Sequence, residues 1–347
     1  MNKLLKKIIL SGLPHGCICA LANLINNIGE QFYLINTKSG CKTIKRRQRV
    51  FQVLTFHRVG NGTNRFFDVI PTDVFERIVQ YLSKSYKIFT ASEAWARTVT
   101  GNLPRNAIVI TFDDGYRDNY TNAMPVLKKY KVSATLFLST GPPDDSKLLW
   151  HDLMFNAFSE TKVSEWRFMK KRYWLSNIQS AKLAVTTFAK YIKKLDETER
   201  DSAIYQLYRD LAIDPKENKN ETTMLTWDEV KVMADNGIEI GSHTVNHPIL
   251  SRLTYGQQFM EISGAIKRIE EKTGIRPKVF AYPNGRLEDF NNDTLSILKR
   301  CGIRSAFTTE VGNNSVDSDP FMLKRGAAWS HDPNKFVLQL ALNRLIE

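Results

Sequence analysis

The sequence predicts an α/β fold in which parallel strands alternate with crossover helices, as an open sheet or a barrel. After about residue 50, short runs of β-branched and apolar residues alternate with helical patterns. Gly237, Gly274 and Gly302 each follow a predicted helix and precede a predicted strand, where a left-handed residue ends a helix at little cost. With 347 residues, 42% of them apolar, the chain has enough material for a sizeable core.

The predicted elements follow one another in a regular order. The first strand is VFQVLTFHRVG, which begins at Val50 and is closed by turn residues. Thr226 with Glu229, and Thr254 with Gln257, have capping-box spacing and mark two helix starts. The remaining boundaries come from the same patterns: strands at 107–112, 133–140, 238–243, 278–282 and 305–309, and helices at 121–130 and near Asp293.

Two segments interrupt this order. Between about residues 148 and 223 the alternation stops, and the composition predicts a helical insertion whose mixed charge is typical of a solvated face. Residues 1–49 are predicted to be a basic, partly apolar helical extension, which leaves 50–347 as the main domain.

The N-terminal extension is expected to associate with a membrane surface. The first fifty residues hold nine Lys and Arg side chains and one acid, so +8 of the net +13 lies there. Its apolar run, 8–25, is interrupted by Pro14 and Gly16, which makes it a poor span. A basic amphipathic or docking helix is the leading interpretation, with an uncleaved signal or anchor and a true span as alternatives. The predicted location is the cell envelope or a membrane. The side of the membrane is not predicted, and the cytoplasmic face is one of the alternatives.

Charge and cysteine usage exclude several classes of protein. The basic excess is confined to one end and no DNA- or RNA-binding motif is present, so no nucleic-acid partner is expected. The four cysteines include no C-x-x-C pair, which argues against a zinc ribbon and a disulfide framework. Any metal must therefore be held by nitrogen and oxygen ligands.

Two short motifs carry the chemistry. Asp113 and Asp114 directly follow an apolar strand, where one carboxylate can bind a metal and the other can take a proton from the metal's water. His243 and His247 lie at i and i+4 after a second strand, so that their imidazoles can face one way. With Asp114 they supply one carboxylate and two imidazoles, a set that leaves positions open for water and substrate.

These motifs resemble those of the NodB-type polysaccharide deacetylases of carbohydrate esterase family 4, in the exopolysaccharide-associated branch. TFDDG at 111–115 is similar to the first motif of the family, HTVNH at 243–247 to the second and FAYPNG at 280–285 to a variant of the third. The resemblance extends over roughly 50–330 and implies a distorted, incomplete (β/α) barrel. It also implies a divalent metal, usually Zn²⁺, on Asp114, His243 and His247, with Asp113 as general base.

The resemblance also implies neighbours for the base. A backbone N–H near Asn284 would help the metal hold the oxyanion, and Pro283 and Asn284 would lie beside the substrate. The third motif usually carries an arginine that orients the base, but Ala281 stands at that position. Arg325 is favoured as its replacement over Arg286, which is nearer in sequence.

The general acid is the second departure from the family's pattern, because the usual late leucine-x-histidine motif is absent. His57 resembles a histidine that lies in the site of exopolysaccharide-associated members and is assigned the acid role, with His331 as the alternative. Tyr116 and Trp227 are expected to offer apolar surface to the sugar, although a core role is equally open for Trp227. Residues 150–152, Trp-His-Asp, resemble a W-x-D-like element of the same branch, whose role is left open.

The predicted function is removal of N-acetyl groups from amino sugars of a polysaccharide or its lipid-linked precursor, in cell-envelope or exopolysaccharide metabolism. The alternatives are a catalytically impaired glycan-binding homologue and a deacylase of another O- or N-acylated sugar. Substrate specificity would reside in the loops and in the insertion, where the sequence contains no motif that identifies a substrate.

Overall fold

The computed structural model describes residues 48–61, 64–145, 147–214, 223–326 and 330–344. It also describes the backbone of the short segments 32–36 and 42–46, together with Ala20 and Ala22.

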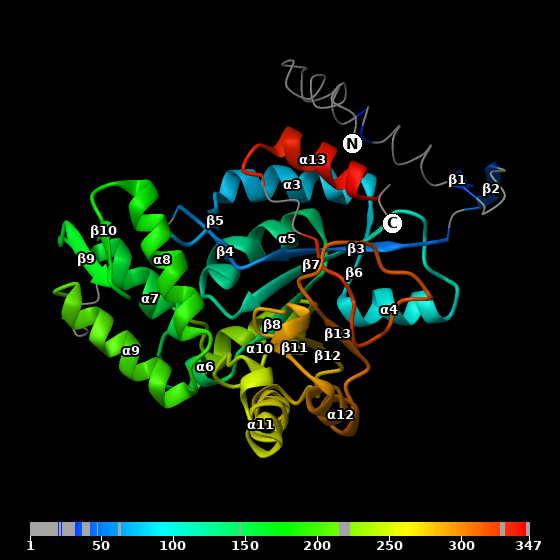
Figure 1. Cartoon of the computed structure of the whole chain (residues 1–347). Helices are drawn as coiled ribbons and strands as arrows, with labels where there is room; N and C mark the ends of the chain where they lie inside the picture. Colours follow the sequence, from blue (N-terminus) through cyan, green and yellow to red (C-terminus); the bar gives the residue numbers. More distant parts are fainter. Residues whose placement is uncertain are drawn as a thin grey trace.

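A curled parallel sheet forms the centre of the molecule (Figure 1). Its strands lie in the order β13-β12-β11-β8-β7-β3, and β6 occupies the part of the β7 edge that β8 leaves free. The bounds are β3 Phe51–Phe56, β6 Lys87–Phe89, β7 Ala107–Asp114, β8 Ala134–Leu138, β11 Ile238–Ser242, β12 Val279–Ala281 and β13 Ser305–Phe307. The prediction of an incomplete barrel of parallel strands is confirmed, because the sheet curls into a half-barrel.

Helices cover the outside of this sheet and bury its apolar side chains. They are α3 Thr72–Ser85, α4 Ala91–Val99, α5 Met124–Tyr130, α10 Trp227–Asp235, α11 Tyr255–Thr273, α12 Asn292–Arg300 and α13 Pro333–Asn343. Shorter turns are η1 Asn119–Ala123, α6 Gly141–Asp145, η3 Leu250–Arg252 and η4 Leu287–Asp289. Strand β7, AIVITFDD, is buried along its whole length, as expected for a strand with helices outside and other strands on both edges.

The predicted helix ends are confirmed. Thr226 and Thr254 each cap a helix with a complete capping box. Gly237, Gly274 and Gly302 have φ of 83°, 73° and 83°, so each turns the chain out of a helix in the left-handed conformation.

An irregular segment bridges the gap between the first and last strands of the sheet. Phe51 of β3 exchanges backbone hydrogen bonds with Asn314, and the Gly326 N–H donates to the Val53 carbonyl. On the other side, the Leu323 N–H donates to the Ala306 carbonyl of β13. The barrel is thus completed by non-strand backbone, and the end of this segment pairs with β3. The small pair β4 Arg58–Val59 and β5 Val69–Ile70 extends the chain beyond β3.

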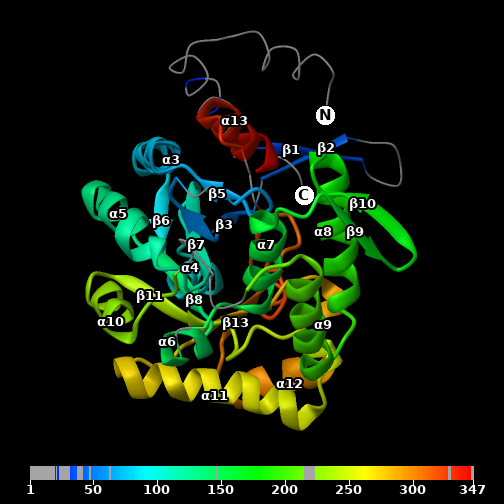
Figure 2. The same cartoon turned by 90° about the vertical axis from the view of Figure 1, so that its left-hand side faces the viewer.

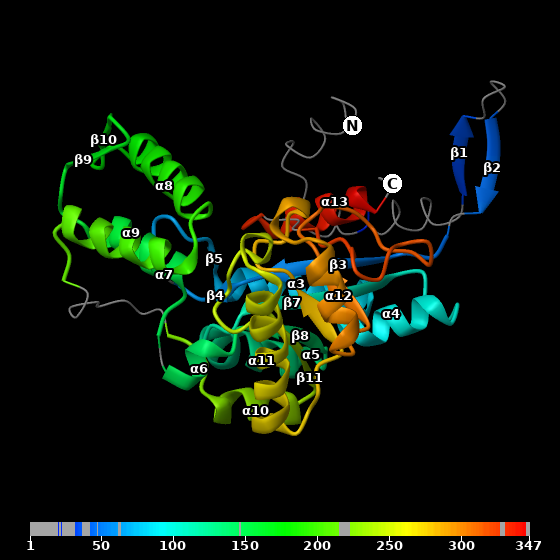
Figure 3. The ribbon, with the colours of Figure 1, turned by 60° about the horizontal axis from the view of Figure 1, so that its bottom comes forward.

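The insertion forms its own small core at the side where the strands end (Figures 1 and 2). It is mainly helical, as predicted, but also contains an antiparallel hairpin that was not predicted. Its elements are α7 Trp150–Glu160, β9 Glu165–Phe168, β10 Lys171–Trp174, α8 Ile178–Ile192 and α9 Glu197–Asp210. Residues 215–222, its predicted polar end, lie outside the described residues. Figure 3 shows how far the insertion projects from the barrel.

The prediction of a helical N-terminal extension is wrong for residues 32–36 and 42–46, whereas Ala20 and Ala22 are helical. Phe32–Asn36 (β1) and Lys42–Arg46 (β2) pair as antiparallel strands. FYLIN and KTIKR contain aromatic and β-branched residues, which favour extended backbone. Apart from Ala20 and Ala22, the apolar run 8–25 lies outside the described residues. In the described part of the chain, no helix is both long and apolar enough to cross a membrane.

Candidate active site

A pocket of about 260 Å³ lies at the carboxyl ends of the central strands. Side chains from β7, from the loop after β11 and from α7 meet in it, and residues distant in sequence complete its wall. The predicted site residues that line it are His57, Asp113, Asp114, His243, His247, Asn284 and Arg325. The sequence motifs therefore converge on one cavity.

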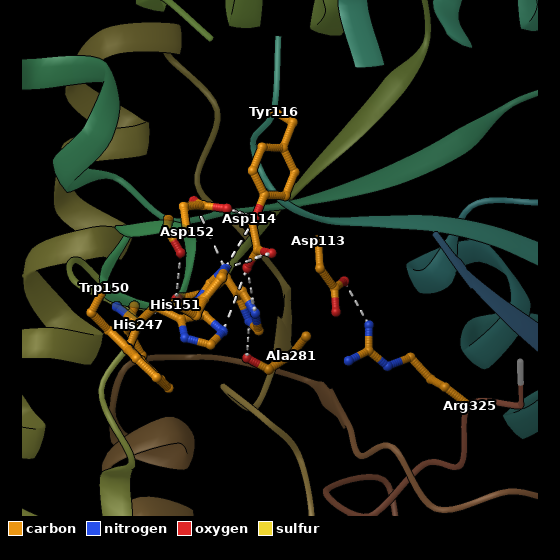
Figure 4. Close-up of polar contacts among 12 residues, drawn as sticks. Asp113, Asp114, Tyr116, Trp150, His151, Asp152, His247, Ala281 and Arg325 are labelled. Atoms are coloured by element: carbon orange, nitrogen blue, oxygen red, sulfur yellow. Dashed lines mark hydrogen bonds and ion pairs between the residues drawn. The ribbon is translucent and has the colours of Figure 1, made fainter. Parts of the chain in front are cut away.

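The two adjacent carboxylates of β7 point in different directions (Figure 4). Asp114 has a φ of 75°, and Gly115 follows with a φ of 99°. A Cβ at Gly115 would lie 2.5 Å from Leu138 Cδ1, so only glycine fits this turn. The left-handed step turns Asp114 toward the histidines and leaves Asp113 facing Arg325.

Asp114, His243 and His247 form a buried cluster that could hold a metal ion. Asp114 Oδ1 lies 3.5 Å from His243 Nε2 and 3.5 Å from His247 Nε2. No hydrogen-bond donor reaches Oδ1 from the described residues. A buried carboxylate oxygen without a donor is costly, and two imidazole nitrogens beside it make a donor set that suits a divalent cation. The residues present therefore fit a metal.

Backbone contacts set the orientation of the two imidazoles. His243 Nδ1 donates to the Ala281 carbonyl oxygen at 2.7 Å, which fixes the tautomer that leaves Nε2 free for a metal. Burial lowers the pKa of His243 and, further, that of His247, so both rings favour the neutral form that binds a metal. Burial alone would raise the pKa of Asp114, but the neighbouring imidazoles hold it well below its usual range.

Arg325 orients the second carboxylate. Its Nη1 donates to Asp113 Oδ1 at 2.7 Å, and its Nε donates to the Thr308 carbonyl at 3.0 Å. Arg325 is 2% exposed and Asp113 is 3% exposed, so the pair is shielded from water. The guanidinium belongs to the segment that bridges β3 and β13, which brings residue 325 beside residue 113. Arg286 does not take this place, because it is exposed and lies 3.8 Å from Glu288.

His151 is the site residue that sequence reasoning missed. Its Nε2 lies 3.6 Å from Asp114 Oδ2 and 3.9 Å from Asp152 Oδ2. Burial opposes protonation, but Asp152 and Asp114 together raise the pKa of His151. His151 therefore lies beside the second oxygen of the Asp114 carboxylate. The only sequence signal was the Trp-His-Asp element, whose role the sequence left open.

The expectation that Tyr116 faces the sugar is wrong. Tyr116 is fully buried, and its hydroxyl donates to Asp152 Oδ1 at 2.8 Å and lies 3.0 Å from His151 Nε2. Tyr116 therefore contacts His151 and Asp152 inside the protein and does not line the pocket. Trp227 does not line the pocket either, since its indole donates to Asp144 on the outer surface and its ring packs against the core.

Two residues of the third motif, Tyr282 and Asn284, line the pocket. Asn284 lines the pocket with a φ of 58°, and its carbonyl accepts from Thr309 Oγ1. Pro283 is buried and is absent from the pocket lining, so its predicted place beside the substrate is not supported. Of the eight non-glycine residues with positive φ in the described part of the chain, four lie in these loops: Asp114, Thr244, His247 and Asn284.

The two histidines considered as general acid lie in different environments. His57 is half-buried in the pocket, with its ring edge-on to Phe67 at 6.0 Å. Asn119 Nδ2 donates to the His57 carbonyl at 2.8 Å and fixes the backbone there. His331 is 48% exposed and pairs with Asp68 at 2.9 Å, away from the pocket. The geometry thus leaves His57 as the candidate of the two.

Comparison with known proteins gives matches to one family. A family model described as polysaccharide deacetylase matches residues 100–306, more than half of the chain. YxkH of Bacillus subtilis (strain 168), a protein assigned as a polysaccharide deacetylase, is 26% identical over 275 residues, which cover 79% of this chain and 69% of the relative. A poly-beta-1,6-N-acetyl-D-glucosamine N-deacetylase of Staphylococcus aureus (strain MSSA476) is 28% identical over 180 residues, 46% of this chain and 61% of that protein.

Solved structures agree on the fold. The Streptococcus pyogenes deacetylase PplD in complex with acetate has a TM-score of 0.58 at 19% identity, over 84% of this chain and 98% of that one. IcaB from Ammonifex degensii has a TM-score of 0.56 at 20% identity, over 85% and 98% of the two chains. At these identities the likeness establishes the fold alone, and it agrees with the half-barrel described above.

Proposed function

The chain belongs to the polysaccharide deacetylase family and is a hydrolase of the deacetylase type, and from that premise we propose that it uses a divalent metal, Zn²⁺, to remove N-acetyl groups from amino sugars. The substrate is a polysaccharide or its lipid-linked precursor, in cell-envelope or exopolysaccharide metabolism. The observation that carries the proposal is the buried Asp114 Oδ1, which lacks a donor and faces two imidazole nitrogens at 3.5 Å.

The side chains of the pocket divide the reaction between them. Asp114, His243 and His247 would hold the metal, which when bound lowers the pKa of a water ligand and polarises the acetamide carbonyl. Asp113, held by Arg325, is placed to take the proton of the attacking water. A backbone N–H near Asn284 would hold the developing oxyanion. His57 would return a proton to the leaving amine.

Metal removal tests the proposal directly. We expect about one Zn²⁺ per chain by elemental analysis, and acetate release from N-acetylglucosamine oligomers that stops after chelation and returns when Zn²⁺ is restored. Acetate release that persists in metal-free protein would contradict it. Bound metal without any acetate would favour a glycan-binding homologue, or another acyl group as the one removed.

Replacing His57 with alanine tests the general acid. We expect kcat to fall about 100-fold because the leaving amine loses its proton donor, while metal content stays normal. A general acid acts only when protonated, so the variant should lose the alkaline limb of the pH–rate profile. His331→Ala is the matched control and should keep both the rate and the profile. An unchanged profile in His57→Ala would move the acid role elsewhere.

The membrane association predicted for residues 1–49 remains a proposal, as does a location in the cell envelope. The support is the basic charge of this segment. Protease treatment of intact cells that carry the chain with a tag at each end would test the side of the membrane. Protection of both tags would exclude an exported location.

A further inference from the structure

A groove of about 800 Å³ lies beside the catalytic pocket, between the insertion and the barrel. Phe67, Phe155, Ala189, Lys193 and Asn284 line both spaces, so the groove opens directly into the pocket. A substrate with its acetamide at the metal site would therefore extend along this groove.

The groove is strongly basic. We call it the basic groove, after its seven cationic side chains: Arg65, Lys182, Lys190, Lys193, Lys194, Arg252 and Arg286. Its three acids are Asp68, Glu288 and Asp289. Asp68 is already paired with His331, and Asp289 accepts from the Arg286 backbone N–H. Glu288 lies 3.8 Å from Arg286 Nη1, so one cation of the groove is paired with one of its acids. Seven cations against three acids still leave the groove with a net positive charge.

One helix face supplies much of this charge. Lys182, Thr186, Lys190 and Lys193 follow the i, i+4, i+8, i+11 spacing along and just beyond α8, which places them on one side of the helix. Among the described residues none of these three lysines forms an ion pair, although ion pairs are common elsewhere on the surface. From Lys193 at the pocket to Lys182 the row extends about 16 Å along the helix.

This charge distribution does not suit a neutral glycan. Removal of an acetyl group from a neutral amino-sugar polymer creates a primary amine, which is cationic at neutral pH. A basic groove would repel that product and would offer no charge complementarity to the neutral substrate. A substrate with acidic groups would instead be attracted to the groove, and the contacts with those groups would fix its position along the groove.

We propose that the substrate carries anionic groups, phosphates or carboxylates, close to the N-acetylated sugar, and that the basic groove binds them. The proposal rests on the proposed deacetylase function and names its substrate class. The row on α8 would contact anions several sugar units from the reacting acetamide, while Lys193 would contact those next to it. The phosphates could belong to a lipid-linked diphosphate sugar and the carboxylates to an acidic polymer.

Binding to the full-length Asp113→Asn variant tests the proposal without requiring turnover. The probes are a hyaluronan hexasaccharide, UDP-N-acetylglucosamine and neutral chitohexaose, titrated calorimetrically at low and at physiological ionic strength. We expect at least one anionic probe to bind about tenfold more tightly than chitohexaose, and to weaken as salt rises. Tight binding of UDP-N-acetylglucosamine would indicate that the anionic groups of the substrate are those of a lipid-linked diphosphate sugar. Tight binding of hyaluronan would indicate that they are the carboxylates of an acidic polymer. Equal or tighter binding of chitohexaose would overturn the proposal.

Charge reversal in the groove localises the effect. For hyaluronan, Lys182→Glu with Lys190→Glu should remove the tenfold preference and leave chitohexaose binding unchanged. For UDP-N-acetylglucosamine, whose phosphates adjoin the sugar, Lys193→Glu should remove it. Lys162→Glu with Lys171→Glu reverses two exposed lysines of the insertion outside the groove, and should change nothing. A preference for hyaluronan that survives Lys182→Glu with Lys190→Glu, or one for UDP-N-acetylglucosamine that survives Lys193→Glu, would overturn the proposal. Lys182→Gln with Lys190→Gln, checked by thermal melting, separates charge from folding. Failure of the deacetylase function itself would show separately, as absent metal and as no acetate release by the wild-type protein from either the neutral oligomers or the anionic probes.

Discussion

Asp113→Asn is expected to reduce kcat by about 10²- to 10⁴-fold, while the protein keeps its full metal content. Asparagine has nearly the same shape as aspartate but cannot accept the proton of the attacking water. Asp113 does not face the two imidazoles, so the metal ligands remain intact. Acetate release and elemental analysis on the same preparation measure both effects.

The control for Asp113→Asn is Asp235→Asn, which neutralises an exposed carboxylate on α10. It should keep wild-type activity. Asp113→Asn leaves the buried Arg325 without its charge partner, so the melting temperature should be checked, since breaking such a pair costs about 3–5 kcal/mol. A folded Asp113→Asn variant with full activity would show that another group is the base.

His243→Ala is expected to abolish metal binding, and activity with it. His243 supplies one of the two imidazoles that face Asp114 Oδ1, and its ring is anchored to the Ala281 carbonyl. Without it the cluster offers one carboxylate and one imidazole, too few protein ligands for a catalytic zinc site. Elemental analysis after dialysis should fall from about one ion per chain to background.

Activity in His243→Ala should not return when Zn²⁺ is added at concentrations that restore the chelated wild-type protein. His331→Ala removes an exposed histidine that pairs with Asp68 and does not line the pocket. This variant should bind metal normally. Normal metal content in His243→Ala would mean that the ion is held elsewhere.

The fold and the metal cluster were predictable because their signals are local. Parallel strands end in short motifs, and carboxyl ends of parallel strands meet at one edge of a sheet. The helix caps at Thr226 and Thr254 and the left-handed glycines are equally local features. Each can be read from fewer than ten residues.

What the sequence could not explain or predict depends on packing between distant segments. The sequence favoured Arg325 as the partner of Asp113, but the reason for the contact appears only in the structure, where an irregular segment completes the barrel between β3 and β13. His151 reaches Asp114 only because α7 of the insertion packs against the strand ends. Tyr116 follows the DDG motif directly, but its position in sequence did not reveal that its ring points into the protein.

The four left-handed residues of the pocket loops have a consequence for engineering this enzyme. Left-handed backbone at non-glycine residues costs about 1–3 kcal/mol each, and the cost is greatest for a β-branched side chain such as Thr244, with a φ of 69°. Selection for heat resistance alone would favour glycine or asparagine there and at His247, and would erase a ligand in the process. Thermostable variants should therefore be sought in the outer helices, with the loops held constant.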